Sequence, residues 1–225
     1  MNPVFRHLFV LFFAFCCFQS GSIYAQQDFK IPALSKNGKT LTDFVPRGWS
    51  VKARAEGDLN KDGRNDVAAI FIFDGENSGK EKFEDYPRLL VFLLRQPDDT
   101  LQLSAASDQV ILGKNMGGVY GDPFQSLKIE HGTVVVNHYG GSREKWGNVY
   151  RFRYQEGDWF LIGKTIFTSD SLSRKKDTTD TNLLTGKVIE TKVTANGKST
   201  VIEKTLPRKS LTSLSSPDFA SELSR

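Results

Sequence analysis

The stretch NVYRFRYQ, residues 148–155, alternates aromatic with basic side chains and decides the fold class of this chain. Tyr150, Phe152 and Tyr154 fall on one face of an extended strand, whereas the arginines between them fall on the other. This period of two predicts a β-strand with one buried face. Residues 156–158 (EGD) form a turn signal before a second apolar run, so a β-hairpin is expected here.

Short runs of the same kind follow one another from residue 49 onward. Two of them, 67–73 and 89–94, are continuously apolar, which is typical of central strands covered on both faces. Helical patterns are confined to two short segments, 41–45 and 217–223. The sequence predicts an all-β fold, or a β-rich α+β fold: an antiparallel sandwich or partly closed barrel with a C-terminal hairpin extension. The expected strands are 49–56, 66–73, 88–95, 124–130, 133–139, 148–155 and 159–167.

The first 25 residues have the pattern of a signal peptide. Arg6 precedes an apolar run at 8–18, and a polar stretch leads to Ala25, after which cleavage is expected. The apolar run is too short to span a membrane, so a retained N-terminal anchor is the less favoured alternative. We expect an exported protein, periplasmic or secreted, with no transmembrane anchor after signal cleavage.

The mature chain is expected to hold one calcium-binding β domain, residues 26–168, followed by an appendage, residues 169–225. Within the appendage, the polar segment 168–181 predicts an exposed loop. A hairpin turning at Asn196-Gly197 is expected next, as an addition to the edge of the main sheet or as a small mobile arm. Residues 207–225 are expected to be weakly ordered.

Cysteine content and charge exclude several classes of protein. Cys16 and Cys17 both lie in the apolar run of the signal, which excludes disulfides, thiolate metal sites and a cysteine nucleophile from the mature chain. Loss of Arg6 leaves 29 basic against 26 acidic residues, a net charge of +3. The basic excess lies beyond residue 170, so no nucleic-acid-binding surface is expected.

The segment DLNKDGRND, residues 58–66, places oxygen-bearing side chains at the spacing of a calcium loop. Side chains at alternate positions converge when the backbone curls, Gly63 permits the sharp turn, and a backbone carbonyl can add a ligand. The alternative is an acidic turn that satisfies only its own backbone. The expected Ca²⁺ ligands are Asp58, Asn60, Asp62 and Asp66 through their side chains and Arg64 through its carbonyl.

This loop resembles the FG-GAP or VCBS repeats of integrin-type propellers and of many exported bacterial proteins. The twelfth position, which holds a bidentate glutamate in an EF-hand, is Ala69 here, so a strand–loop–strand setting is expected. The motif occurs once, whereas a propeller requires several blades. The loop, residues 117–124 and residues 138–146 together resemble a group of uncharacterised exported bacterial proteins, which implies one β domain and no particular activity.

A candidate ligand surface lies near two Gly-Gly pairs, at 117–118 and 140–141, which allow close backbone approach. His138, Tyr139, Ser142 and Trp146 would form a polar–aromatic surface for a glycan or a peptide. The competing interpretation places Tyr139 and Trp146 in the core or at its rim and His138 at the surface.

These patterns favour an exported calcium-binding β-domain protein that acts as a binding or structural module in the cell envelope, with a glycan or protein as its ligand. The alternative is an envelope hydrolase of glycans or peptides that uses carboxylates of the 74–87 loop as acid and base. Solvation of a long hairpin loop is the simpler explanation of those carboxylates. No catalytic residue is assigned.

Overall fold

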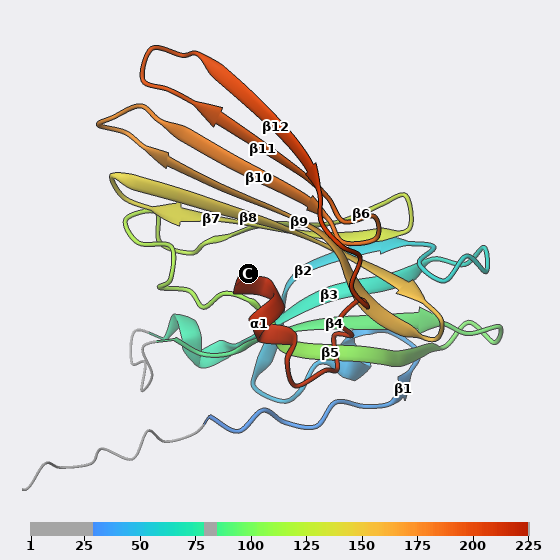
Figure 1. Cartoon of the computed structure of the whole chain (residues 1–225). Helices are drawn as coiled ribbons and strands as arrows, with labels where there is room; N and C mark the ends of the chain where they lie inside the picture. The colour runs from blue at the N-terminus through green and yellow to red at the C-terminus, as the bar shows by residue number, and fades with distance from the viewer. Residues whose placement is uncertain (1–28, 79–84, 225) are drawn as a thin grey trace, which may run out of the picture.

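The computed structural model describes residues 29–78 and 85–224. The expected signal peptide, residues 1–25, lies outside the described residues. The described chain forms two antiparallel sheets packed face to face, which confirms the expectation of an all-β sandwich (Figure 1). None of the helices in the described part of the chain is long and apolar enough to cross a membrane.

The first sheet has five strands in the order β1-β5-β4-β3-β2. Its strands are β1 (Asn37–Gly38), β2 (Trp49–Gly57), β3 (Asp66–Phe73), β4 (Arg88–Arg95) and β5 (Leu101–Ile111). Two short 3-10 helices, η1 (Leu41–Phe44) and η2 (Asp74–Asn77), flank it.

The second sheet is a continuous meander of seven strands, in the order β12-β11-β10-β9-β8-β7-β6. Its strands are β6 (Phe124–Glu130), β7 (Thr133–Gly141), β8 (Glu144–Gln155), β9 (Asp158–Asp170), β10 (Lys176–Asn182), β11 (Lys187–Val193) and β12 (Ser199–Thr205). A short helix, α1 (Phe219–Ser224), ends the described chain.

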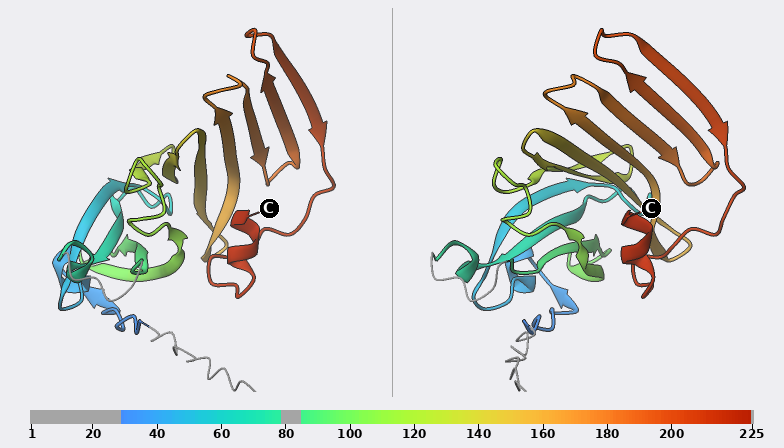
Figure 2. Two further views of the ribbon diagram at one scale, coloured as in Figure 1. Left: turned by 90° about the vertical axis from the view of Figure 1, so that its left-hand side faces the viewer. Right: turned by 60° about the vertical axis from the view of Figure 1, so that its left-hand side comes forward.

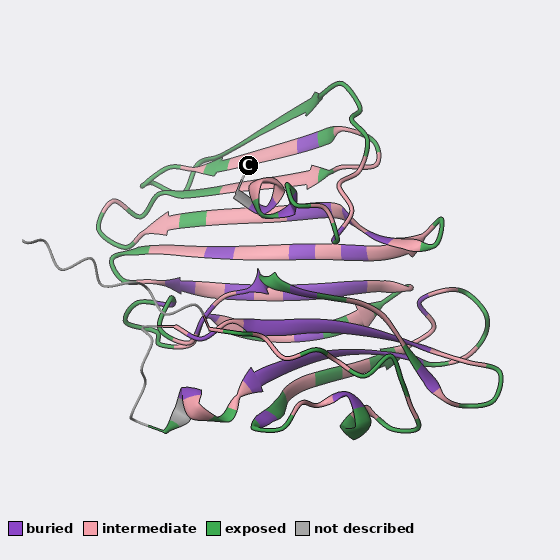
Figure 3. Ribbon diagram, turned by 90° about the horizontal axis from the view of Figure 1, so that it is seen from below, coloured by how far each residue is buried: buried purple, intermediate pink, exposed green. Residues whose placement is uncertain are grey.

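Strands β3 and β4 are buried on both faces, as their continuous apolar runs predict (Figure 3). One face, including Ile70 and Phe92, packs in the core between the two sheets. The other face, including Phe71 and Val91, packs in a second core with η1 and the N-terminal segment that begins at Phe29.

Strand β8 behaves as its alternating sequence predicts. Tyr150 and Phe152 are buried in the core between the sheets, and Trp159 of β9 stacks on Phe92 at 3.9 Å between ring centroids. At the β8–β9 turn, Glu156 and Gly157 both adopt positive φ, which matches the expected tight hairpin.

The expected exposed loop at 168–181 is wrong. Strand β9 continues through Asp170, and residues 176–182 form β10, which is paired on both sides by β9 and β11. The polar sequence misleads because no residue of β10 is buried on either face of the sheet, so no apolar period is required. Threonine is common in strands because its branched side chain fits a pleated, half-buried surface, and the three threonines of β10 are half-buried. The expected domain boundary at 168 therefore falls inside β9, and the C-terminal hairpin β11–β12 extends the main sheet.

The expectation of a weakly ordered tail is wrong for residues 213–224, whereas residues 207–212 form no regular element. Leu214, Phe219 and Leu223 are buried in the core between the sheets, and Phe219 lies 6.1 Å from Phe152 between ring centroids. The chain returns from the far edge of the meander to place α1 beside β5, and Lys164 of β9 donates a hydrogen bond to the Glu222 carbonyl of α1 at 2.6 Å (Figure 2). The short helix expected at 217–223 is present as α1.

Candidate functional site

The predicted calcium loop joins β2 to β3, and its exposed oxygens cap its own backbone. The Asp58 carboxylate accepts hydrogen bonds from the backbone N–H groups of Lys61, Asp62 and Gly63, at 2.7 to 3.1 Å. The Asn60 side-chain oxygen accepts from Asp62 N at 3.0 Å. This curled backbone holds the three alternating side chains, Asp58, Asn60 and Asp62, on one loop.

Asp66 differs from these three because it is fully buried. Its carboxylate accepts hydrogen bonds from Leu59 N and Arg95 N, both at 2.8 Å, and from Asn60 N at 3.3 Å. Burial raises the pKa of Asp66, and these hydrogen bonds counteract part of that rise. Its carboxylate therefore attaches the loop to the start of β3 and the end of β4.

The donor chemistry of the loop suits a hard cation, since carboxylate and amide oxygens are the ligands that Ca²⁺ prefers. The Arg64 guanidinium competes for the same oxygens, because its Nη1 lies 3.1 Å from Oδ2 of Asp62. Among the described residues, no group of three or more His, Cys, Asp or Glu side chains is arranged to hold a metal. The side-chain oxygen of Asn60 and the carbonyl oxygen of Arg64 would have to join the carboxylates of Asp58 and Asp62 as ligands of the ion.

Strand alternation separates the four residues of the predicted ligand surface. His138 is buried and faces the same side of the sheet as Trp146, which is paired with Gly140. Tyr139, paired with Gly147, faces the opposite, outer side. Ser142 is exposed in the turn between β7 and β8. The structure therefore does not bring these four side chains to one surface.

Tyr139 instead belongs to an aromatic platform formed with Tyr120 and Phe167 on the outer face of the seven-stranded sheet. The Phe167 ring is nearly parallel to that of Tyr139, with centroids 5.9 Å apart, and Tyr120 meets Tyr139 edge-on at 5.0 Å. Hydrogen bonds from the Tyr139 hydroxyl and the Lys145 ammonium lower the pKa of Tyr120. The platform thus combines ring surface with two hydroxyls and one cation.

The loop that carries Tyr120 is held against β7 by backbone contacts that only glycine allows. Gly118 pairs with Gly141, and a Cβ at Gly118 would lie 2.6 Å from the Gly141 carbonyl oxygen. Gly141 N donates to Gly117 O at 2.9 Å, and Val119 N donates to Gly141 O at 3.1 Å. The two Gly-Gly pairs identified in the sequence therefore bind each other.

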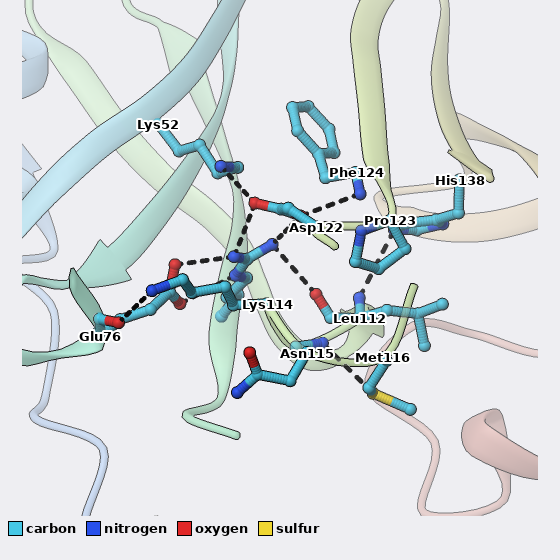
Figure 4. Close-up of polar contacts among 12 residues, drawn as sticks. Lys52, Glu76, Leu112, Lys114, Asn115, Met116, Asp122, Pro123, Phe124 and His138 are labelled. Atoms are coloured by element: carbon cyan, nitrogen blue, oxygen red, sulfur yellow. Dashed lines mark hydrogen bonds and ion pairs between the residues drawn. The ribbon is translucent and has the colours of Figure 1, made fainter. Parts of the chain in front are cut away.

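Both ends of the same loop are anchored by a buried ion network (Figure 4). Arg88, fully buried at the start of β4, donates two hydrogen bonds to Glu76, at 2.7 and 2.9 Å. It donates two more to Asp122, at 2.8 and 2.9 Å, and one to the Leu112 carbonyl at 3.2 Å. Lys52 completes the charge balance with an ion pair to Asp122 at 2.7 Å.

The protonation states within this network follow from its contacts. Burial opposes ionisation of Asp122, but hydrogen bonds from Arg88 and Lys52 outweigh it and lower the pKa of Asp122 to about 2. Glu76, which the sequence suggests is a solvated loop carboxylate, is buried and paired with Arg88. Asp122 is therefore a poor proton donor, and both oxygens of Glu76 are occupied by hydrogen bonds from Arg88.

His138 closes the network on the side of the seven-stranded sheet. Its Nε2 accepts a hydrogen bond from Leu112 N at 3.4 Å, which requires a neutral ring with the proton on Nδ1. Nδ1 is buried and has no hydrogen-bond partner among the described residues. Burial and the nearby positive charge of Arg88 lower the pKa of His138 to about 4.

The sequence did not indicate that four further residues lie around the 112–122 loop: Arg88 and Asp122 in the ion network, and Tyr120 and Phe167 in the aromatic platform. A weak signal exists for Arg88, a charged residue that opens a continuously apolar run, but its partners are 12 and 34 residues away. Comparison with protein-family models, with curated proteins and with solved structures finds no match for this chain. The resemblance of the calcium loop to FG-GAP repeats therefore remains a resemblance.

Proposed function

We propose that this protein is an exported β-sandwich module of the cell envelope that acts by binding, with the aromatic platform of Tyr120, Tyr139 and Phe167 as its ligand site. The bound ligand is a glycan, and Ca²⁺ at the Asp58–Asp66 loop stabilises the module. The hydrolase alternative has no comparable support among the described carboxylates of the 74–87 loop, because Glu76 is buried and paired with Arg88 and Asp85 accepts a hydrogen bond from Asn115 N at 2.8 Å. Residues 79–84 of that loop lie outside the described residues.

One observation carries the proposal: the loop at 112–122 is built rigidly and yet exposes apolar side chains. Met116 is 50% exposed, Val119 is 78% exposed and Tyr120 is 46% exposed. A buried ion network is costly to assemble and is seldom justified by stability alone. Exposed apolar side chains on a preorganised loop are typical of binding sites, because little conformational entropy is lost on contact.

The composition of the platform favours a glycan as the ligand. Tyr and Phe rings offer flat surfaces for the C–H face of a pyranose, and buried sugars also need polar partners for their hydroxyls. The hydroxyls of Tyr120 and Tyr139 and the ammonium of Lys145 lie together at the platform.

The binding proposal is tested with a protein that starts at Gln26, screened by NMR against soluble peptidoglycan fragments, neutral polysaccharides and an apolar peptide panel. Tyr120→Ala should weaken glycan binding by at least about tenfold, as expected for an aromatic anchor. Leu172→Ala removes a 75% exposed side chain elsewhere and should leave binding unchanged. Glycan binding that is indifferent to Tyr120→Ala, or binding of peptides alone, would reject the glycan site.

For Ca²⁺, the fit to the loop rests on donor type and spacing. Asp58, Asn60 and Asp62 would hold the ion with the Arg64 carbonyl, while Asp66 would keep the loop attached to β4. The bound ion would supply positive charge that fixes the β2–β3 connection. An extracellular site with Kd of about 10⁻⁴ M, in about 10 mM Ca²⁺, would stabilise the fold by ~2.7 kcal/mol.

The calcium proposal is tested by thermal melts with EDTA, Ca²⁺ and Mg²⁺. We expect Tm to rise by roughly 5–11 °C with Ca²⁺ and not with Mg²⁺, and we expect Asp62→Ala to remove that rise. Asp108→Ala changes an exposed carboxylate on β5 and serves as the matched control. Equal responses of Asp62→Ala and the native protein to Ca²⁺ would leave the loop as an acidic turn.

A further inference from the structure

Strand β12 is the free edge of the seven-stranded sheet. It comes last in the strand order, and all seven of its residues, Ser199–Thr205, are exposed (Figure 3). Together with β10 and β11 it extends past the five-stranded sheet, so no described element lies beside its outer edge (Figure 1 and Figure 2). An unpaired strand edge is a template for another strand.

The hydrogen bonds at both ends of the β11–β12 hairpin show which backbone groups are free. Thr194 N donates to Lys198 O at 3.0 Å, and Leu206 N donates to Gly186 O at 2.9 Å. Because antiparallel ladders alternate, the even-numbered residues of β12 point toward β11. The N–H and C=O groups of Ser199, Val201, Glu203 and Thr205 therefore point outward along the free edge.

The usual protections of an edge strand are missing or neutralised here. The pairing of β11 with β12 is regular, without a bulge, and β12 contains no proline. Its two charged side chains are each paired with β11, Glu203 with Lys187 at 2.9 Å and Lys204 with Glu190. Val201, 58% exposed, and Ile202, 45% exposed, leave apolar surface at the middle of the edge.

The sequence of β12 is complementary to itself in one antiparallel register. A twofold axis at Ile202 pairs all seven residues, with Ser199 opposite Thr205, Thr200 opposite Lys204, and Val201 opposite Glu203. No like charges face each other in this register.

Sliding the two strands by two residues in either direction creates a like-charge pair. One shift places Lys198 opposite Lys204, and the other places Glu203 opposite Glu203 of the second copy. Odd shifts are excluded because the outward-pointing backbone groups would no longer match. Among these registers, charge therefore selects the one centred on Ile202, which is also the one that pairs the full length of β12.

We propose that two copies of this protein associate through β12, forming an antiparallel β12–β12 pair with a twofold axis at Ile202. The pair joins two seven-stranded sheets into one continuous sheet. Each outward-pointing residue of one copy forms a hydrogen-bonded pair with its counterpart in the other copy, and Ile202 contacts Ile202 across the axis. The aromatic platforms of both copies stay free, so the dimer is independent of the proposed ligand site.

The first test measures the oligomeric state of the protein starting at Gln26, which contains every described residue and no cysteine. Sedimentation velocity over a wide dilution series should reveal a monomer–dimer equilibrium. Val201→Pro removes an outward N–H and leaves the bonds to β11 in place, so it should yield a monomer with unchanged circular dichroism. Val201→Thr, which keeps that N–H, should still dimerise.

The second test reports the register. At a non-hydrogen-bonded antiparallel pair the Cα atoms are about 4.5 Å apart, within the range that a disulfide requires. Under mild oxidation, Ile202→Cys should therefore form a disulfide-linked dimer at least roughly tenfold faster than Lys204→Cys. In this register residue 204 of one copy is opposite residue 200 of the other, so the two cysteine side chains introduced at position 204 are too far apart to bond. A monomer at every concentration, a Val201→Pro protein that still dimerises, or equal crosslinking of the two cysteine variants would each overturn the proposal.

Discussion

Replacement of His138 by glutamine should flatten the acid dependence of stability. In the native protein His138 is 3% exposed and lies between Phe124 and Tyr150, with ring centroids 6.4 and 6.2 Å away. Protonation would place a second positive charge near Arg88 and would set an N–H of the ring against Leu112 N–H. The folded protein therefore keeps the ring neutral to a lower pH than the unfolded chain does.

The expected loss in the free energy of unfolding follows from the pKa values of His138 in the unfolded and folded chains. Its pKa falls from 6.5 to about 4 on folding, and each pKa unit corresponds to about 1.4 kcal/mol. Between these values the unfolded chain binds one proton more than the folded chain, so the free energy of unfolding decreases as pH falls. The loss should reach roughly 3 kcal/mol by pH 4.

Urea denaturation at a series of pH values from 7 to 4 measures this loss. The native protein should lose about 3 kcal/mol more than His138→Gln, because other groups titrate alike in both proteins. The pKa of Asp122 is lowered from 3.8 to about 2 on folding, so its contribution to stability is lost only as the pH falls below about 3.8. The titration of Asp122 therefore does not affect the comparison between pH 7 and pH 4. The control His131→Asn alters an exposed turn residue and should follow the native curve. Parallel curves for native protein and His138→Gln would refute the reasoning.

Two further substitutions test the packing around the candidate site and the C-terminal segment. Arg88→Leu should lower the free energy of unfolding by ~3–5 kcal/mol, because Glu76 is left buried without its cation and Asp122 keeps only Lys52. A loss below about 1 kcal/mol, the value typical of surface pairs, would contradict this expectation. Phe219→Ala should cost ~3–4 kcal/mol in urea denaturation, since the ring is fully buried between the sheets. Leu206→Ala, at a 48% exposed position, is its control and should change stability by less than about 0.5 kcal/mol. Similar losses for these two variants would show that α1 does not close the core.

Strands with an apolar signature could be predicted from the sequence, because burial imposes the pattern. Residues 66–73 and 88–95 occur as β3 and β4 with the expected bounds, and the alternation at 148–155 marks the inner face of β8. Strands whose faces are exposed or lined by small residues lack that pattern. Both β5 and β10 were missed for this reason, although pairing with neighbouring strands holds them in place.

The candidate site was only partly predictable, because its members are far apart in the chain. The Gly-Gly pairs and Tyr139 were identified, and the structure joins those pairs to each other. The grouping of His138 with Tyr139 failed because neighbouring residues of a strand face opposite sides of the sheet. The conformation of the 112–122 loop depends on Arg88, which binds the carboxylates of Glu76 and Asp122 on two separate segments of the chain. No local sequence pattern indicates that these three residues meet.

The sequence by itself determined the all-β class, the main strands of the sandwich and the composition of the β2–β3 loop, since local periodicity and turn chemistry act over a few residues. Only the tertiary structure decided that α1 fills the core, that Arg88 binds Glu76 and Asp122, and that Tyr120 meets Tyr139 and Phe167. These arrangements depend on contacts between distant segments. Their stability comes from burial and charge pairing, which arise only when the two sheets pack together.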